Sequence, residues 1–263
     1  MDKVLKGVLR YGRGVKQYLV PQFKRVRDSP EPTAIMFTCM DSRLLPTRFT
    51  QTNVGDMFIV QNSGNLIPHS SLFGSEGLNT ESAALELACI INGIRHVVVC
   101  GHSDCKAMNT LYSLKDNPYV DRGKHPFRAW LRRFGHTSLA KFEAIEKGYK
   151  GPLKFQGQTA KHNFEAFIDP EDNFNLHDKL SQVNCLQQIQ NISSYGFLKK
   201  HLEDDMVHLH AMWFDVYSGN VFLFSREQKR FVEISTVSFE DLSLECSHLH
   251  QQTEDEPVKK VVC

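Results

Sequence analysis

The sequence has no long hydrophobic run, no strong excess of charge and no dense cysteine framework. No stretch approaches the roughly 18 apolar residues of a membrane span, and the N-terminus lacks the apolar core of a secretory signal. The net charge of +1 gives no reason to expect binding to nucleic acid or to a membrane. Seven cysteines spread over 263 residues are unlike a small disulfide-stapled secreted domain. We therefore expect an intracellular protein whose thiols are free to bind a metal.

Residues 1–28 are rich in basic side chains, and their acidic residues are Asp2 and Asp28. Apolar residues recur there at helical spacing: Val4, Leu5, Val8, Leu9, Val15, Tyr18, Leu19 and Phe23. This pattern predicts an amphipathic helical arm that packs on the domain or on a partner subunit. The same composition is typical of a mitochondrial presequence. The cytoplasm and the mitochondrial matrix therefore both stay open as compartments.

After Pro30-Glu31-Pro32 the chain alternates apolar strands with helices, which predicts a single α/β domain over residues 29–246. Strands are expected at 33–38, 57–61, 96–100, 206–216 and 221–224, the last two as a hairpin. Helices are expected at 80–91, after a turn at Gly101 through about Leu114, at 127–147 and at 176–195. Residues 148–165 read as a loop or a loosely placed element, and residues 247–263 as a mobile tail.

Two of these strands lead into residues that bind soft metals. Cys39 follows strand 33–38, and His102 and Cys105 follow strand 96–100. In an open parallel sheet, ligands collect outside the carboxyl ends of strands, where the strand order reverses. Two thiolates and one imidazole form a known catalytic zinc set, which leaves the fourth position to water or substrate. Soft thiolates also argue against Mg²⁺ or Ca²⁺.

Asp41 and Arg43 lie two and four residues past Cys39 and carry opposite charges. Their spacing favours a bidentate ion pair. Such a pair keeps the carboxylate ionised beside a metal-bound water, where it accepts a hydrogen bond and orients the nucleophile. Zinc lowers the pKa of its bound water to about 7, so the expected nucleophile at neutral pH is a hydroxide.

Two other interpretations of these motifs stay open. The stretch from Gly101 to Cys105 nearly matches the Gly-x-Ser-x-Gly nucleophile elbow of α/β-hydrolases, with Ser103 as the nucleophile. That interpretation gives Cys39 and its neighbours no role. Alternatively, the zinc is structural and Asp41 closes the site as a fourth permanent ligand. The remaining cysteines and histidines considered are interpreted as core or surface residues: Cys89, Cys100, Cys185, His96, His208 and His210.

With these motifs in this order and spacing, the sequence resembles the β-class carbonic anhydrases, most of all the animal members. The resemblance is carried by four stretches: Cys39-Met-Asp-Ser-Arg43, Gly55-Asp-Met-Phe58, Asn62-Ser-Gly-Asn65 and Gly101-His-Ser-Asp-Cys105. It implies an α/β fold with a mostly parallel sheet in the strand order 2-1-3-4 plus an edge strand, flanked by helices. It also implies a homodimer, or a multiple of one, in which the N-terminal helical arm lies on the partner.

The resemblance further implies reversible hydration of CO₂ to bicarbonate and a proton, by attack of a zinc-bound hydroxide. In this family pattern Cys39, His102 and Cys105 bind the zinc, and Asp41 and Arg43 form a catalytic dyad. In some members the residue corresponding to Asp41 becomes a fourth zinc ligand in a closed state.

Overall fold

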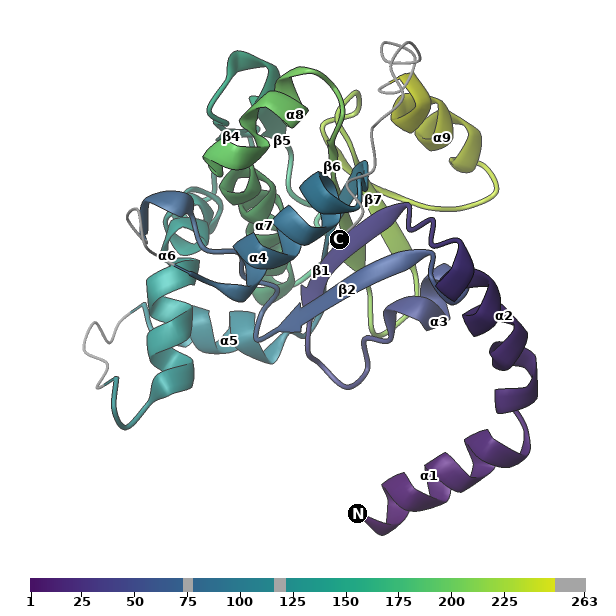
Figure 1. The fold of residues 1–263 in the computed structure, drawn as a ribbon. Helices are drawn as coiled ribbons and strands as arrows, with labels where there is room; N and C mark the ends of the chain where they lie inside the picture. Colours follow the sequence, from purple (N-terminus) through teal and green to yellow (C-terminus); the bar gives the residue numbers. More distant parts are fainter. Residues whose placement is uncertain (73–77, 116–121, 249–263) are drawn as a thin grey trace.

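The fold is built on a six-stranded sheet in the order β2-β1-β3-β6-β7-β8 (Figure 1). The computed structural model describes residues 1–72, 78–115 and 122–248. The strands of the sheet are β1 Ala34–Cys39, β2 Met57–Asn62, β3 His96–His102, β6 His208–Phe214, β7 Val221–Ser225 and β8 Arg230–Glu233. The first four strands in the sheet order are parallel, and β7 is antiparallel to both of its neighbours, β6 and β8. The predicted α/β class and the order 2-1-3-4 with an added edge strand are confirmed, whereas β8 was not predicted.

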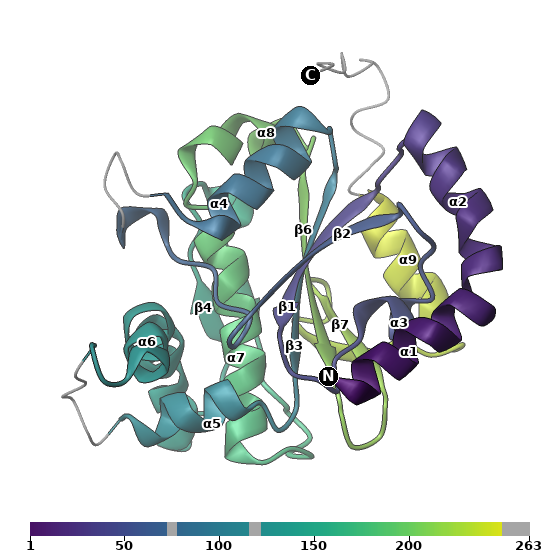
Figure 2. The same cartoon turned by 60° about the horizontal axis from the view of Figure 1, so that its bottom comes forward.

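Helices cover both faces of this sheet. Their bounds are α1 Asp2–Arg13, α2 Lys16–Asp28, α3 Pro46–Thr50, α4 Thr80–Leu85, α5 Lys106–Ser113, α6 Pro126–Glu146, α7 Leu176–Ile192, α8 Lys199–Glu203 and α9 Phe239–His248. A π-helical segment, η3 Glu86–Ile91, continues α4, and the Asn79 side chain caps α4 by accepting from the Ser82 N–H. Figure 2 shows α4 to α8 on one face and α2, α3 and α9 on the other.

The strands next to the metal-binding motifs are buried on both faces. One face contributes Ile35, Phe37, Val97 and Val99 to the main core, and the other contributes Met36, Val98 and Cys100 to a smaller cluster. Continuous apolar runs of this kind are typical of parallel sheets covered on both sides. The core therefore fixes the carboxyl ends of β1 and β3, from which the two motifs extend.

Helix α7 departs from the simple amphipathic helix that its sequence predicts, because 14 of its 17 residues are buried. Three of its polar side chains bind a loop of the protein. Asn184 Nδ2 donates to the Gly64 carbonyl at 3.1 Å, Asn191 Nδ2 donates to the Ile67 carbonyl at 2.7 Å, and the Ile67 N–H donates to Gln188 Oε1 at 2.7 Å. Buried backbone groups need such partners, so α7 holds the loop that passes beside Cys39.

A small antiparallel pair, β4 Leu153–Phe155 and β5 Phe164–Ala166, forms within and at the end of the segment predicted as a loop or loose element. Leu153, Phe155 and Ala166 are buried. Each strand spans only three residues, which is too short for a hydrophobic period to appear in the sequence. The first two residues of the predicted tail, Ser247 and His248, belong to α9, and its remaining residues, 249–263, lie outside the described part.

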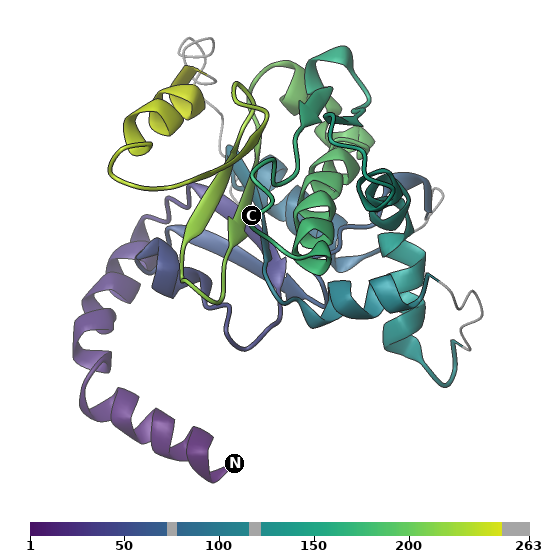
Figure 3. The ribbon, with the colours of Figure 1, turned by 180° about the vertical axis from the view of Figure 1, so that it is seen from behind.

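The N-terminal arm consists of α1 and α2, and neither helix contains a buried residue. Figures 1 and 3 show α1 extending away from the sheet on the side remote from α6. The apolar side chains of Val4, Leu5, Val8 and Leu9 are 57–60% exposed. Within the described ranges, no helix combines the length and apolarity needed to cross a bilayer.

Substitution of Gly64 by alanine tests how closely the Asn62–Asn65 loop packs on α5. Gly64 and Gly148 both have φ +87, so an alanine at either position is strained by about 1–2 kcal/mol. A Cβ at Gly64 would lie 2.9 Å from the Ala107 Cβ, whereas nothing lies within 4 Å at Gly148. We expect Gly64→Ala to lower the free energy of unfolding by a further 1–3 kcal/mol, roughly, relative to Gly148→Ala, as measured by urea denaturation. Equal losses in the two variants would contradict the close packing.

Candidate metal centre

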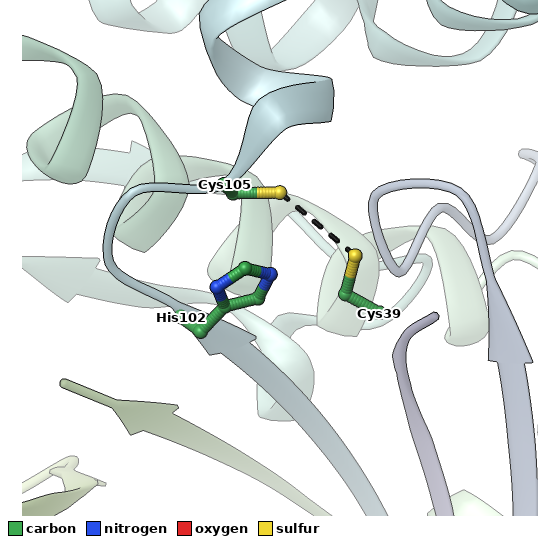
Figure 4. Close-up of side chains that lie close together, drawn as sticks. All are labelled: Cys39, His102 and Cys105. Atoms are coloured by element: carbon green, nitrogen blue, oxygen red, sulfur yellow. Dashed lines mark hydrogen bonds between the residues drawn. The ribbon is translucent and has the colours of Figure 1, made fainter. Parts of the chain in front are cut away.

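Three potential metal ligands meet at the carboxyl ends of β1 and β3. Cys39 is the last residue of β1, His102 is the last residue of β3, and Cys105 is the N-cap residue of α5. All three side chains are buried, and their ligand atoms lie within 4.8 Å of one another. Figure 4 shows both sulfurs and the imidazole converging on one point. The structure thus brings together the three zinc ligands predicted from the sequence.

The imidazole of His102 is oriented for metal binding. Its Nδ1 lies 2.8 Å from the carbonyl oxygen of Ser103, to which it donates, so Nε2 carries a free lone pair. His102 Nε2 is buried and has no hydrogen-bond partner. A buried polar atom without a partner is costly, and a histidine that ligates a metal commonly donates its other ring N–H to a carbonyl. This arrangement fits a cation bound at Nε2.

The two sulfurs are 3.9 Å apart. Zn–S bonds of about 2.3 Å at a tetrahedral angle place two sulfur ligands about 3.8 Å apart, so the spacing fits zinc. The hydrogen bond between the thiols lowers the pKa of Cys39 and raises that of Cys105. Peptide N–H groups stabilise both thiolates, from Gly64 at Cys39 and from Met108 and Ala107 at Cys105. A divalent cation favours the thiolate form of both residues.

Burial and the neighbouring sulfur act in opposite directions on His102. Burial of the ring is the largest single influence and lowers its pKa, but Cys39, the Ser103 carbonyl and Asp41 together raise the pKa above its ordinary value. A bound cation would compete with that proton, because a ligating imidazole must be neutral.

Asp41 and Arg43 form the predicted ion pair. Arg43 Nε donates to Asp41 Oδ1 at 3.0 Å, and an Nη2 hydrogen goes to Oδ2 at 2.8 Å. The Arg43 backbone N–H also donates to Oδ1 at 2.9 Å. The hydrogen bonds from Arg43 lower the pKa of Asp41 to about 2. Asp41 does not belong to the group of close ligand atoms formed by the other three residues.

A second carboxylate contacts Arg43, and sequence analysis did not single it out. Arg43 Nη1 donates to Asp104 Oδ2 at 2.8 Å, and Nη2 donates to the Asp104 carbonyl at 3.0 Å. Asp104 lies between His102 and Cys105 in the chain, and this position between two predicted ligands is the signal in the sequence that points to it. Its φ of +51 is in the left-handed region, which aspartate tolerates better than most residues.

Ser103 is fully buried and does not have the environment of a serine nucleophile. Its Oγ donates to Asp215 Oδ1 at 2.6 Å and accepts from the Val216 N–H at 2.8 Å. A nucleophile elbow instead exposes the serine hydroxyl beside a general base. These contacts tie the turn between β6 and β7 to the loop that carries His102, so the hydrolase interpretation is wrong.

The other cysteines have the surroundings of core residues, as predicted. Cys89, Cys100 and Cys185 are buried, and burial raises the pKa of Cys89 and of Cys100 to about 12. On β3 and β6, His96 Nδ1 lies 3.0 Å from His210 Nε2, so these two rings pair with each other.

Comparison with known proteins identifies a family. The carbonic anhydrase family model matches residues 34–221. Beta carbonic anhydrase 1 of Caenorhabditis briggsae is 52% identical over 93% of this chain and 92% of its own length. Beta carbonic anhydrase 1 of Caenorhabditis elegans is 48% identical over 97% of this chain and 96% of its own length.

Solved structures agree on the fold. The β-carbonic anhydrase CcaA superposes with a TM-score of 0.70 at 24% identity, over 90% of this chain and 92% of CcaA. A tetrameric β-carbonic anhydrase of Sordaria macrospora gives a TM-score of 0.61 at 16% identity, over 89% of this chain and all of that one. From the family match and the identity to both nematode proteins, the chain belongs to the carbonic anhydrase family and, within it, to the β class.

Proposed function

We propose that this chain is a zinc enzyme that catalyses the reversible hydration of CO₂ to bicarbonate and a proton. The observation that carries the proposal is the buried group of Cys39, His102 and Cys105, with its unpartnered Nε2 atom and a sulfur spacing that suits zinc. Two relatives that are 48–52% identical are named beta carbonic anhydrases, which supports the reaction.

Cys39, His102 and Cys105 would hold the ion and leave a fourth position for water or substrate. When bound, Zn²⁺ supplies a positive charge that lowers the pKa of a coordinated water to about 7. The protein prepares its own ligands for this role. The Ser103 carbonyl fixes the His102 tautomer, and peptide N–H groups from Gly64 and α5 stabilise the thiolates.

Asp41 accepts and orients a hydrogen bond in this mechanism and does not take up the proton. With a pKa of about 2, the Asp41 carboxylate is ionised throughout the neutral range, and protonating it there is unfavourable. Arg43 holds both of its oxygens. A closed state in which Asp41 becomes the fourth zinc ligand therefore requires these hydrogen bonds to break.

We also propose that the protein is a homodimer or a multiple of one, in which α1 lies on the partner subunit. The apolar side chains of Val4, Leu5, Val8 and Leu9 are more than half exposed, and exposed apolar patches mark contact sites. The tetrameric state of the Sordaria enzyme supports an assembly of this kind. The six cysteines in the described ranges are free, which supports a reducing compartment, cytoplasm or mitochondrial matrix.

Replacement of Cys39 by serine is expected to remove both zinc and activity. A serine hydroxyl is a harder and much less acidic ligand than a thiol, so it binds zinc poorly. Metal content per chain, measured by atomic emission, and CO₂ hydration in stopped flow provide the readouts. Cys100→Ser is the matched control, because Cys100 is also fully buried and lies on the neighbouring strand, outside the ligand group. Full zinc and full rate in Cys39→Ser would refute the ligand assignment.

Replacement of Asp41 by asparagine is expected to leave the zinc in place and to lower kcat/KM roughly 10- to 100-fold, because the charged acceptor is lost. The rates are compared over about pH 6 to 9, the range around the pKa of the zinc-bound water. Asp28→Asn serves as control, because Asp28 pairs with Arg27 through two hydrogen bonds in the remote arm. An unchanged rate throughout that pH range contradicts the role given to Asp41.

Substitution of Leu5 by glutamate tests the proposed arm contact. A charge buried against a partner is unfavourable, so we expect a smaller mass by light scattering at low protein concentration. Arg10→Gln alters the net charge by the same amount on the basic side of α1 and is expected to keep the native mass. If Leu5→Glu also keeps it, α1 does not contribute to the assembly.

A further inference from the structure

We propose that Asp104 is a positioning residue for the hydration reaction, which clamps Arg43 and thereby fixes the Asp41 carboxylate beside the metal ligands. The inference rests on the proposed function and adds a residue to it. The carboxylates of Asp41 and Asp104 accept hydrogen bonds from different edges of the Arg43 guanidinium.

Nearly all guanidinium N–H groups of Arg43 donate hydrogen bonds to these two aspartates. Asp41 accepts from Nε and Nη2, and Asp104 accepts from Nη1 through its side chain and from Nη2 through its backbone carbonyl. Four of about five guanidinium N–H groups are thus engaged. The Arg43 side chain is 44% exposed, and an exposed arginine with one partner is weakly held. With both edges bound, the guanidinium cannot turn without losing hydrogen bonds to both residues.

Asp104 is itself held by a buried anchor. Its backbone N–H donates to Asp178 Oδ1 at 2.6 Å, and Asp178 lies in the first turn of α7 and is 3% exposed. Asn175 Nδ2 donates to the other oxygen of Asp178 at 2.7 Å. This support keeps Asp104 in its left-handed backbone conformation, with the carboxylate directed at Arg43.

The contact between Arg43 and Asp104 connects the segment after β1 with the segment after β3. Asp41 and Arg43 both follow β1, so their mutual pairing does not by itself set their position relative to the loop after β3. Asp104 precedes Cys105 directly and lies two residues after His102. Because Arg43 binds both aspartates, it fixes the Asp41 carboxylate relative to His102 and Cys105 as well as relative to Cys39.

Two substitutions at position 104 separate the side chain from the backbone. Asp104→Gly suits the left-handed conformation and removes the carboxylate, whereas Asp104→Asn keeps an oxygen acceptor for Arg43. We expect both variants to retain zinc. We expect kcat/KM for CO₂ hydration to fall roughly tenfold in Asp104→Gly and to recover in part in Asp104→Asn. A wild-type rate in zinc-loaded Asp104→Gly overturns the proposal.

A double-mutant cycle distinguishes positioning from general stability. If Asp104 acts through Asp41, then adding Asp104→Gly to Asp41→Asn lowers kcat/KM little further. If Asp104 has an independent structural role, the two losses multiply, and the proposal is wrong.

A readout on the metal-free protein keeps the clamp separate from the proposed function. Phenylglyoxal modifies accessible guanidinium groups, and peptide mass spectrometry follows its reaction at Arg43. We expect faster modification of Arg43 in Asp104→Gly than in the wild type, with an unchanged rate at Arg10 as the internal control. Equal rates at Arg43 refute the clamp. Absence of zinc binding or of hydration by the wild type refutes the proposed function instead.

Discussion

Two buried thiols and a buried imidazole nitrogen without a hydrogen-bond partner lie within 4.8 Å of one another, and the surrounding structure is arranged around this group. The buried imidazole nitrogen is unfavourable there unless a cation or a hydrogen-bond donor binds it. The sheet places the members of this group at the ends of two adjacent parallel strands, both fixed by core on two faces. Helix α7 holds the loop around Gly64, whose N–H supports the Cys39 sulfur.

Charged residues beside this group, Asp41, Arg43 and Asp104, are held in place by hydrogen bonds to one another. Asp41 lies two residues past Cys39, and Arg43 binds both of its carboxylate oxygens. The low pKa of Asp41 keeps its carboxylate ionised at neutral pH, so in the proposed reaction the released proton leaves by another route. Asp104 joins this pair to the loop after β3. Ser103, which a motif alone would have named a nucleophile, instead fastens that loop to the turn after β6.

Local patterns predicted the parts of this protein that depend on local chemistry. The apolar runs ending at Cys39 and near His102 gave the strands, and the spacing of ligand residues gave the metal group. The burial of α7 was not predictable, because its glutamines and asparagines look solvated until the loop that they bind is in place. The strands β4, β5 and β8 span only three or four residues each, too few for a hydrophobic period to appear in the sequence. The contact of Asp104 with Arg43 joins residues 61 positions apart. The family resemblance added the order of the strands.

The most direct test measures zinc content and CO₂ hydration together on the unmodified protein, at acid and at alkaline pH. The account predicts one tightly bound zinc per chain and a hydration rate that rises with pH through about 7, as a coordinated water ionises. Stoichiometric zinc without hydration at any pH would show a closed, structural site and would contradict the account.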